Sequence, residues 1–286
     1  MASERDIKRR IRSCRNVQQI TKAMKMVAAA RIKKAENRLK ASKPYALKLQ
    51  EVVTELCGQL EGALHPLLEA RPVHKLGVVI VSSDKGLCGA YNNNLLKLAY
   101  GFIESQGKSR EVKLMAIGGK AVKFLSRRKR ALSAQEVKWN PEIELARKLA
   151  QQLSDWFLSG EVDEVVCFYT QAITAMTQKP AMEKLLPLTP EKKEGGVQLP
   201  YQFEPTVEQS LGILLPRYLQ TLMFRILLES RVAELGSRLR AMTNATDNAD
   251  KLAGELTLLY YRIRQDNITK EILEISGGAE ALKARS

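Results

Sequence analysis

The N-terminal 60 residues place apolar and small side chains at helical spacing. From residue 28 onward the intervals alternate between four and three residues, which is typical of a coiled-coil seam. A continuous helix over residues 3–60 would be roughly 85 Å long, more than a small domain can bury. Pro44 falls within this run, and we expect a kink there. The repeating positions are Ile7, Ile11, Cys14, Val17, Ile20, Met24, Val27, Ala28, Ile32, Ala35, Leu39, Ser42, Ala46, Leu49, Val53, Leu56 and Leu60.

The C-terminal residues follow the same spacing in two stripes that differ in phase. If residues 217–286 form one helix, it spans roughly 105 Å, and we expect Gly277 and Gly278 to fray its end. All ten prolines lie between Pro44 and Pro216, so both ends of the chain are free of helix breakers. Two long helices, one at each terminus, most simply pair antiparallel. The stripes are Leu235, Leu239, Met242, Ala249, Leu252, Leu256, Leu259 and Ile263, then Ile268, Ile272, Ile275, Ala279 and Leu282.

The middle of the chain has a different pattern of apolar positions. Short β-branched apolar runs at 77–83, 112–119 and 162–170 predict buried strands, and helical patterns at 92–106, 120–128 and 141–160 alternate with them. This alternation predicts a parallel sheet in an α/β domain. Residues 179–205 hold five prolines and a Gly-Gly pair, so we expect a loop region there.

The predicted fold class is therefore α/β: a long antiparallel coiled coil of the terminal helices plus a Rossmann-like α/β domain with a mainly parallel sheet. The coiled-coil helices are predicted at 1–62 and 207–286, and the α/β domain at 73–205. No run approaches the roughly 18 consecutive apolar residues typical of a membrane span, and the N-terminus lacks the apolar core of a secretory signal. We expect a soluble, cytosolic chain.

Charge is concentrated at one end. Of a net charge of +15, residues 1–48 contribute most, with 15 Lys and Arg against 3 Asp and Glu, whereas the rest of the chain is nearly balanced. Such a segment should meet an acidic partner. A basic helix that continues into a zipper could enter the major groove of DNA. Here the apolar stripe continues through the basic residues, which favours a protein ring or sleeve with an acidic inner face, and nucleic acid stays open as the alternative.

Catalytic and ligand-binding motifs are not found in the sequence. Four cysteines stand far apart and only two histidines are present, so the cysteines are interpreted as reduced and structural. The strand-to-helix turn at 82–94 has the outline of a phosphate loop but lacks the Gly and Lys pattern of one, and Gly86 and Gly89 are interpreted as turn residues. A second near match at 101–109 lies at a helix end, where the dipole repels phosphate. We predict no cofactor, no metal and no catalytic site.

Three separated motifs carry a resemblance to a known family. The segments ITKAMKMVAAA (20–30), SSDKGLCGAYNNNL (82–95) and RIRQDNITKEILEISGGAEAL (262–282) resemble the gamma subunit of the rotary F-type ATP synthase, in the right order. The similarity extends from about residue 2 to residue 282. The cysteine pair of the regulatory insert in chloroplast members has no counterpart, so a bacterial type is expected.

The resemblance implies a central-stalk rotor subunit. In this family the paired terminal helices lie inside a hexamer of three alpha and three beta subunits, and the α/β domain contacts the epsilon subunit and the ring of c subunits. Proton flow turns the ring and the shaft, and ATP chemistry belongs to the beta subunits. The chain would then be non-catalytic by itself, would not bind nucleic acid, and would lie at the cytoplasmic face of the bacterial membrane, attached only through the complex.

The resemblance also implies particular contact residues. Contacts with beta subunits transfer to Met24 and Lys25 on the first helix, and a bearing tip is expected on the last helix. Lys25 stands where the family usually carries Glu, and Asp266 and Lys270 stand where small or neutral residues are common, so we expect a changed strength of the contact with beta. On the last helix the beta contacts are Arg264, Gln265, Thr269 and Glu271, and the tip residues are Ile268, Ile272, Ile275 and Leu282.

Overall fold

The structure is a computed structural model that describes residues 4–58, 65–174, 177–189 and 206–283, with Val207 and residues 280–283 described only as backbone. The chain divides into two compact units. We call Met1–Val27 with Leu239–Ser286 the helical unit, and Ala28–Arg238 the sheet unit. Two long helices, α1 (Glu4–Gly58) and α5 (Val207–Lys283), contribute to both.

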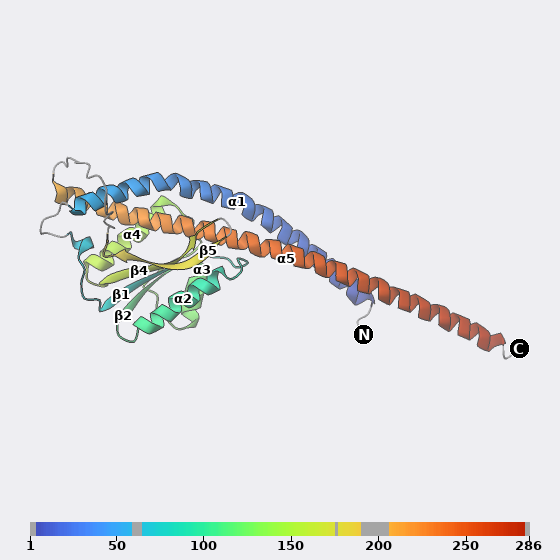
Figure 1. The fold of residues 1–286 in the computed structure, drawn as a ribbon. Helices are drawn as coiled ribbons and strands as arrows, with labels where there is room; N and C mark the ends of the chain where they lie inside the picture. The colour runs from blue at the N-terminus through green and yellow to red at the C-terminus, as the bar shows by residue number, and fades with distance from the viewer. Residues whose placement is uncertain (1–3, 59–64, 175–176, 190–205, 284–286) are drawn as a thin grey trace. The chain divides into compact units, whose positions relative to one another are not determined.

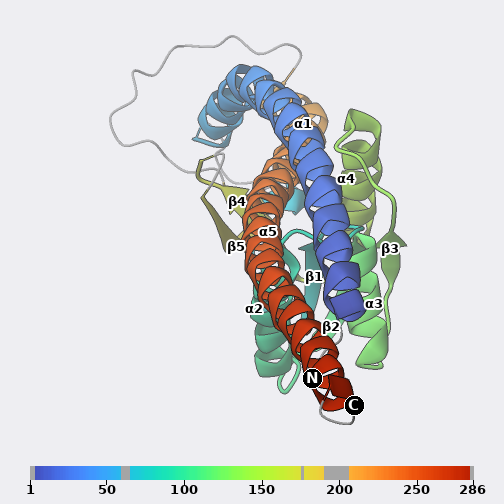
Figure 2. The same cartoon turned by 90° about the vertical axis from the view of Figure 1, so that its right-hand side faces the viewer.

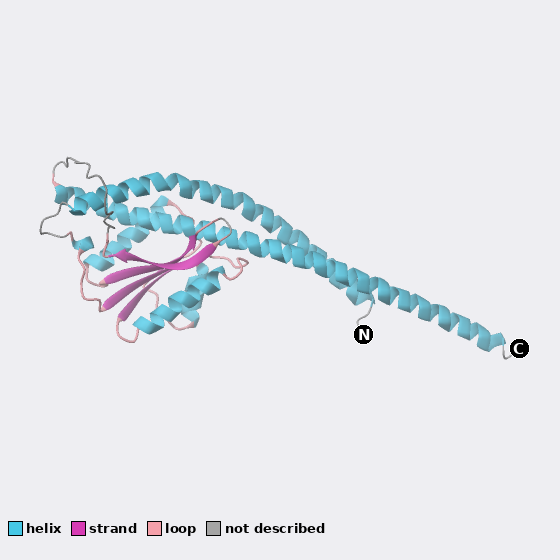
Figure 3. Ribbon diagram, viewed as in Figure 1, coloured by secondary structure: helices cyan, strands magenta, loops and turns pink. Residues whose placement is uncertain are grey.

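A sheet, magenta in Figure 3, forms the centre of the sheet unit. It has five strands in the order β3-β2-β1-β4-β5. Strands β1 to β4 are parallel to one another, and β5 pairs antiparallel with β4. The predicted mainly parallel sheet is therefore confirmed. The strands are β1 (Lys75–Val81), β2 (Glu111–Ile117), β3 (Ala134–Glu136), β4 (Glu164–Ala172) and β5 (Gln178–Leu186).

Helices cover both faces of this sheet (Figure 1). Because successive side chains of a strand point to opposite faces, β1 sends Val78 and Ile80 to one core and Val79 and Val81 to another. The first core is closed by α2 (Tyr91–Gln106) and α3 (Gly119–Arg127). The second is closed by α4 (Ile143–Leu158) together with the first turns of α5 and the last turns of α1. A short 3-10 helix, Pro66–Leu68, adds Leu67 to the second core.

Helices α1 and α5 run in opposite directions in the sheet unit (Figures 1 and 2). Near the start of α5, Leu211 and Leu215 share a core with Val53 and Leu56 of α1. Helix α1 continues through Pro44 without a break. Its ribbon is curved within the sheet unit (Figure 1). Helix α5 likewise contains Pro216 and begins earlier than residue 217. The predicted fraying at Gly277 and Gly278 is wrong, since α5 extends to Lys283.

A polar cluster joins α5 to the antiparallel edge of the sheet. Arg225 forms an ion pair with Glu183 of β5 and another with Glu229, whose Oε1 lies 3.2 Å from Arg225 Nη1. Tyr169 of β4 donates its hydroxyl to Glu183 Oε2 at 2.8 Å. Burial raises the pKa of Glu229 despite its arginine partner. These contacts connect α5 with β4 and β5.

Helix α5 contains an apolar stretch as long as a membrane span. An 18-residue window within Glu208–Ala279 reaches a mean hydropathy of 1.3, so by length and composition this helix could cross a membrane. Of that window, 44% is buried inside the structure. Core helices meet the same criterion, and the first turns of α5 lie in the core of the sheet unit.

Two strands were missed by the sequence analysis. Residues 179–205 were expected to form a loop region, but β5 extends to Leu186, while residues 190–205 lie outside the described residues. β5 is an edge strand that contains Pro180 and three charged residues, and such strands carry a weak apolar signal. β3 is only three residues long. The other strands and helices predicted for the middle of the chain are present, with ends shifted by at most two residues.

Gly118 should be the glycine least tolerant of substitution. Its φ is +95°, and an added Cβ would lie 2.2 Å from the backbone oxygen of Ser82. We expect Gly118→Ala to lower the free energy of unfolding by about 3 kcal/mol, because backbone strain and a clash add together. Gly160→Ala is the control, since its φ is +72° with nothing within 4 Å, and strain alone should cost about 1 kcal/mol. Urea denaturation measures both, and equal costs would contradict the role of the clash.

Candidate functional site

The helical unit is built on direct pairing of α1 with α5. Gln18 Nε2 donates to Asp250 Oδ1 at 2.8 Å, and Thr246 Oγ1 donates to Thr21 Oγ1 at 2.8 Å. As the residue number rises along α1 it falls along α5, so the two helices are antiparallel. The seam is closed by buried small and aliphatic side chains, namely Ile7, Ile11, Met242, Ala249 and Ala253.

The same pairing continues within the sheet unit. Ile32 and Ala35 of α1 form an apolar cluster with Val232 and Leu235 of α5. Ala35 is 8% exposed, and a small residue at this position lets the two backbones approach closely. The predicted antiparallel coiled coil of the terminal helices is therefore confirmed in both units.

The residues that the resemblance assigned to contacts with beta subunits all lie in the helical unit. On α1, Met24 and Lys25 are half-buried. On α5 the four assigned residues are exposed, and the Thr269 hydroxyl donates to the Gln265 carbonyl at 2.9 Å within the helix. Arg264 and Glu271 are likewise exposed. Their roles in contacts with beta subunits are predictions.

The expected bearing tip is an exposed apolar stripe on α5. Ile268 is 45% exposed, Ile272 is 60% and Ile275 is 73%. The side chain of Leu282 lies outside the described residues. Sequence reasoning missed Leu273, which is 64% exposed on the same stretch of α5. Large exposed aliphatic side chains gathered on one helix indicate a surface that another molecule covers.

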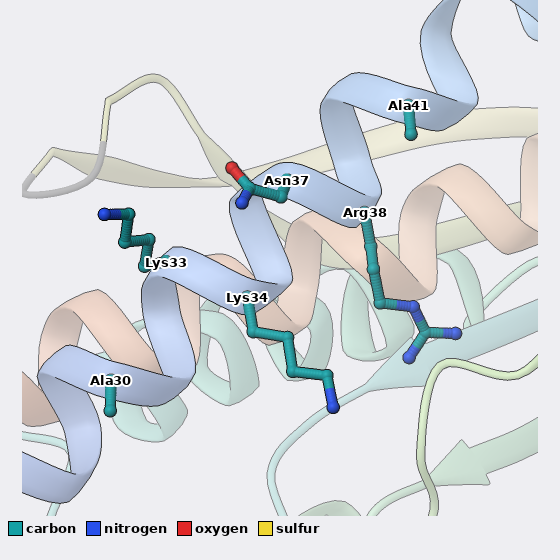
Figure 4. A pocket seen from close by; sticks show the side chains of 6 residues that line it. All are labelled: Ala30, Lys33, Lys34, Asn37, Arg38 and Ala41. Atoms are coloured by element: carbon teal, nitrogen blue, oxygen red, sulfur yellow. The ribbon is translucent and has the colours of Figure 1, made fainter.

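A basic face lies on α1 in the sheet unit. Lys33, Lys34 and Arg38 surround a shallow depression with Asn37 between them (Figure 4). Ala30 and Ala41 line its two ends, so the lining residues repeat at three- and one-residue intervals along one side of the helix. Arg38 also donates to the Pro141 carbonyl at 2.9 Å, which fixes its side chain. Part of the basic excess seen in the sequence is thereby gathered on one exposed helix face.

Several polar groups of the turn that resembles a phosphate loop are bonded to other groups of the protein. The backbone N–H of Ser83 donates to Asn92 Oδ1 at 3.1 Å, and Asn92 Nδ2 donates to Cys88 Sγ at 3.1 Å. Burial raises the pKa of Cys88, and that of Cys167 more strongly. All four cysteines are free, and in the described part of the chain no three His, Cys, Asp or Glu residues are grouped to hold a metal ion.

Comparison with known proteins decides the family. A family model described as ATP synthase matches residues 3–282. The chain is 45% identical over 285 residues to the ATP synthase gamma chain of Desulfitobacterium hafniense, covering 99% of this chain and 100% of that protein. The chain belongs to the ATP synthase gamma-chain family. The gamma chain of Moorella thermoacetica is also 45% identical, over 287 residues, with the same coverage of both chains.

Solved structures agree with this assignment. A chain from the central stalk and c-ring of the Tetrahymena thermophila mitochondrial ATP synthase has a TM-score of 0.59 at 25% identity, covering 79% of this chain and 99% of that chain. A chain from the Euglena gracilis mitochondrial ATP synthase has a TM-score of 0.71 at 17% identity, covering 98% and 95%, and shows the shared fold. The predicted gamma-subunit family is thus confirmed, and nothing in these comparisons supports the nucleic-acid alternative.

The seam between α1 and α5 should reject large side chains. We expect Ala35→Leu to lower the free energy of unfolding by about 1–3 kcal/mol, because extra methylene groups would force the helices apart. Ala41→Leu is the matched control: the same substitution on the exposed face of the same helix should change stability by less than about 0.5 kcal/mol. Thermal and urea unfolding of both variants measure the difference, and a tolerated Ala35→Leu would argue against close packing here.

Proposed function

We propose that this gamma-family chain acts as the central shaft of a proton-translocating ATP synthase. It receives rotation from a ring of c subunits and passes it to catalytic beta subunits as conformational change. The observation that carries this proposal is the antiparallel pair of α1 and α5, joined to an α/β unit, in a chain that matches gamma chains over its whole length. A pair of packed helices resists bending and twisting better than one helix.

The shaft works by making unequal contacts. Three otherwise equivalent catalytic sites differ only if the shaft presents a different surface to each, because only a difference in contact energy shifts a conformational equilibrium. The helices of this chain carry such asymmetry. α1 has an exposed basic face around Lys33, Lys34 and Arg38, whereas the end of α5 exposes Ile268, Ile272 and Ile275. Rotation would present these surfaces to each beta subunit in turn.

The proposed assembly contains three alpha and three beta subunits, one epsilon subunit and the c-ring. ATP synthesis and hydrolysis take place on the beta subunits, so the chain is non-catalytic by itself. It lies at the cytoplasmic face of the bacterial membrane and associates with the membrane only through the complex. The basic face of α1 supports contact with acidic segments of the surrounding subunits, since opposite charge favours that docking.

We assign the contacts with beta subunits to Met24 and Lys25 of α1 and to exposed residues of α5. Ile268, Ile272, Ile275 and Leu282 form the bearing tip, where an apolar surface allows rotation with few directional bonds to break. The α5 contacts are Arg264, Gln265, Thr269 and Glu271, all on the exposed surface of that helix.

The proposal is tested by ATPase activity of purified alpha and beta subunits from the same organism, with and without this chain, alongside gel filtration. The chain should be inactive alone, form a stable complex and strongly increase turnover. Folded alpha and beta subunits that neither bind the chain nor respond to it would contradict the proposal. A salt-dependent DNA-binding assay would then test the basic helix instead.

Loss of the α5 contacts should weaken coupling to the beta subunits. We expect Arg264→Ala combined with Gln265→Ala to lower the ATPase rate of the complex by about ten-fold, as expected when polar contacts worth about 1–2 kcal/mol are removed from an interface. Arg262→Ala, which removes a neighbouring exposed arginine outside the assigned set, is the control and should leave the rate nearly unchanged. Equal rates for the double variant and the control would remove the assignment.

Lys25 gives a test of charge on α1. We expect Lys25→Glu to lower the ATPase rate of the complex by about two-fold or more, because it would replace attraction to an acidic partner by repulsion. Lys25→Gln should give an intermediate rate if charge is the cause. Turnover measured at low and high salt checks this, since screening should reduce the difference. Identical rates for native and Lys25→Glu complexes would refute the role of this residue.

A further inference from the structure

The last turns of α5 in the sheet unit contain a buried ion cluster. Glu234 is only 2% exposed, and glutamate is rarely buried unless it is paired. Its Oε2 lies 2.7 Å from Arg231 Nη1, and its Oε1 lies 2.7 Å from Arg238 Nη1. Both carboxylate oxygens thus have a cationic partner, which offsets the cost of removing this charge from water. The sheet unit's part of α5 ends at Arg238.

This cluster is tied to the turn between β1 and α2. Three hydrogen bonds join α5 to that turn and to the first residue of α2, and each uses a backbone carbonyl as acceptor. They run from Arg238 Nη2 to Gly86 O at 3.2 Å, from Ser237 Oγ to Cys88 O at 2.8 Å, and from Tyr91 Oη to Ser230 O at 3.1 Å. The guanidinium of Arg238 therefore bridges the buried carboxylate and the turn.

The turn itself holds an unfavourable backbone conformation. Leu87 has a φ of 62° and is 63% exposed, although a residue with a side chain rarely adopts a positive φ. Such a conformation persists only where the surrounding structure holds it. The two carbonyls bound by α5, those of Gly86 and Cys88, belong to the residues directly before and after Leu87. Contacts from α5 thus fix the turn on both sides of its strained residue.

Apolar packing between α5 and the turn is sparse. Among the described residues, the buried apolar cluster that joins them consists of Cys88, Tyr91 and Ala233, with Ala172 packed against it. Earlier in α5, by contrast, residues from Leu211 to Leu227 belong to the large core of the sheet unit. Apolar contacts are non-directional and allow small displacements, whereas hydrogen bonds depend on distance and angle. Polar contacts therefore determine the orientation of α5 at the turn.

Helix α1 packs against the same segment of α5. Val232 and Leu235 contact Ile32 and Ala35 of α1, while Glu234, Ser237 and Arg238 engage the ion cluster and the turn. At helical spacing these two sets lie on opposite sides of α5, so the helix is held from both sides. This arrangement resists rotation of α5 about its own axis.

We propose that the Ser230–Arg238 segment of α5 and the Ser83–Tyr91 turn form a torsional latch. Through it, torque passes between the sheet and α5 with little angular displacement of one against the other. Glu234 is the positioning residue at its centre. The inference rests on the proposed function, because only a rotating shaft has torque to transmit. Glu234 acts through Arg238, which lies on the turn, and is too buried to contact another subunit directly.

Angular fluctuation of the rotor tests the latch. A bead is coupled to one introduced cysteine, Lys108→Cys, at an exposed position of the sheet unit, in a background carrying Cys14→Ser and Cys57→Ser. Alpha and beta subunits of the assembled complex are immobilised, and the angular variance of the bead is recorded while the rotor pauses. We expect Glu234→Gln to increase this variance by about two-fold, since it removes the charge that holds two arginines in place.

Glu144→Gln is the matched control. It makes the same substitution in an exposed ion pair with Arg147 on α4 and should leave the variance unchanged. Ser237→Ala provides a second variant that removes only the bond to the Cys88 carbonyl, in case Glu234→Gln does not assemble. It should also increase the variance.

The outcomes separate the two proposals. Variants that rotate with the native variance would overturn the latch, even if their thermal stability is reduced, because a merely structural role affects stability alone. A native chain that forms no rotating complex would refute the proposed function, and the latch with it. Both proposals are supported if the native chain rotates, if the Glu234→Gln or Ser237→Ala rotor shows a larger angular variance than the native rotor, and if the Glu144→Gln rotor shows no increase.

Discussion

The antiparallel pairing of α1 with α5 is the interaction on which the rest of this structure depends. Most of the stability of a long helix comes from packing of its apolar face, and these two helices pack on each other. Each supplies the other with a seam of small and aliphatic side chains, within the helical unit and again within the sheet unit. Small residues such as Ala28 and Ala35 keep the backbones close, and the Thr21–Thr246 hydrogen bond fixes the register.

In the sheet unit, α1 and α5 pack against the sheet. One core attaches α2 and α3 to one face of the sheet, and the other attaches α4 and both long helices to the opposite face. Along α5 the contacts change from apolar, near Leu211, to polar, at Arg225 and then at Glu234. The apolar part supplies most of the stability, whereas the polar part sets orientation. A rotor needs both properties, since a base that held the shaft only by apolar contact could slip.

The elements with a repeating apolar pattern could be predicted from the sequence, and the features that depend on contacts between distant residues could not. The seams of α1 and α5 are visible because a helix repeats its apolar face over many turns. β5 carries no such signal, since an edge strand with one face exposed mixes Lys179, Glu183 and Lys184 with apolar residues. Glu234 and Arg238 look like ordinary solvated helix positions in sequence, and only the fold brings them to the Gly86–Cys88 turn. The assigned contact residues came from family resemblance alone. Exposed side chains such as Arg264 and Thr269 give no sign in the sequence pattern that they bind another subunit.

The most direct test of the central claim is observation of rotation by this chain. Alpha and beta subunits from the same organism, assembled with the chain, are fixed to a surface, and a bead on the sheet unit is followed as ATP is added. The account predicts sustained rotation in one direction that stops when ATP is removed. Steady ATP hydrolysis by the same complexes, with the bead fluctuating about one fixed angle, would contradict it.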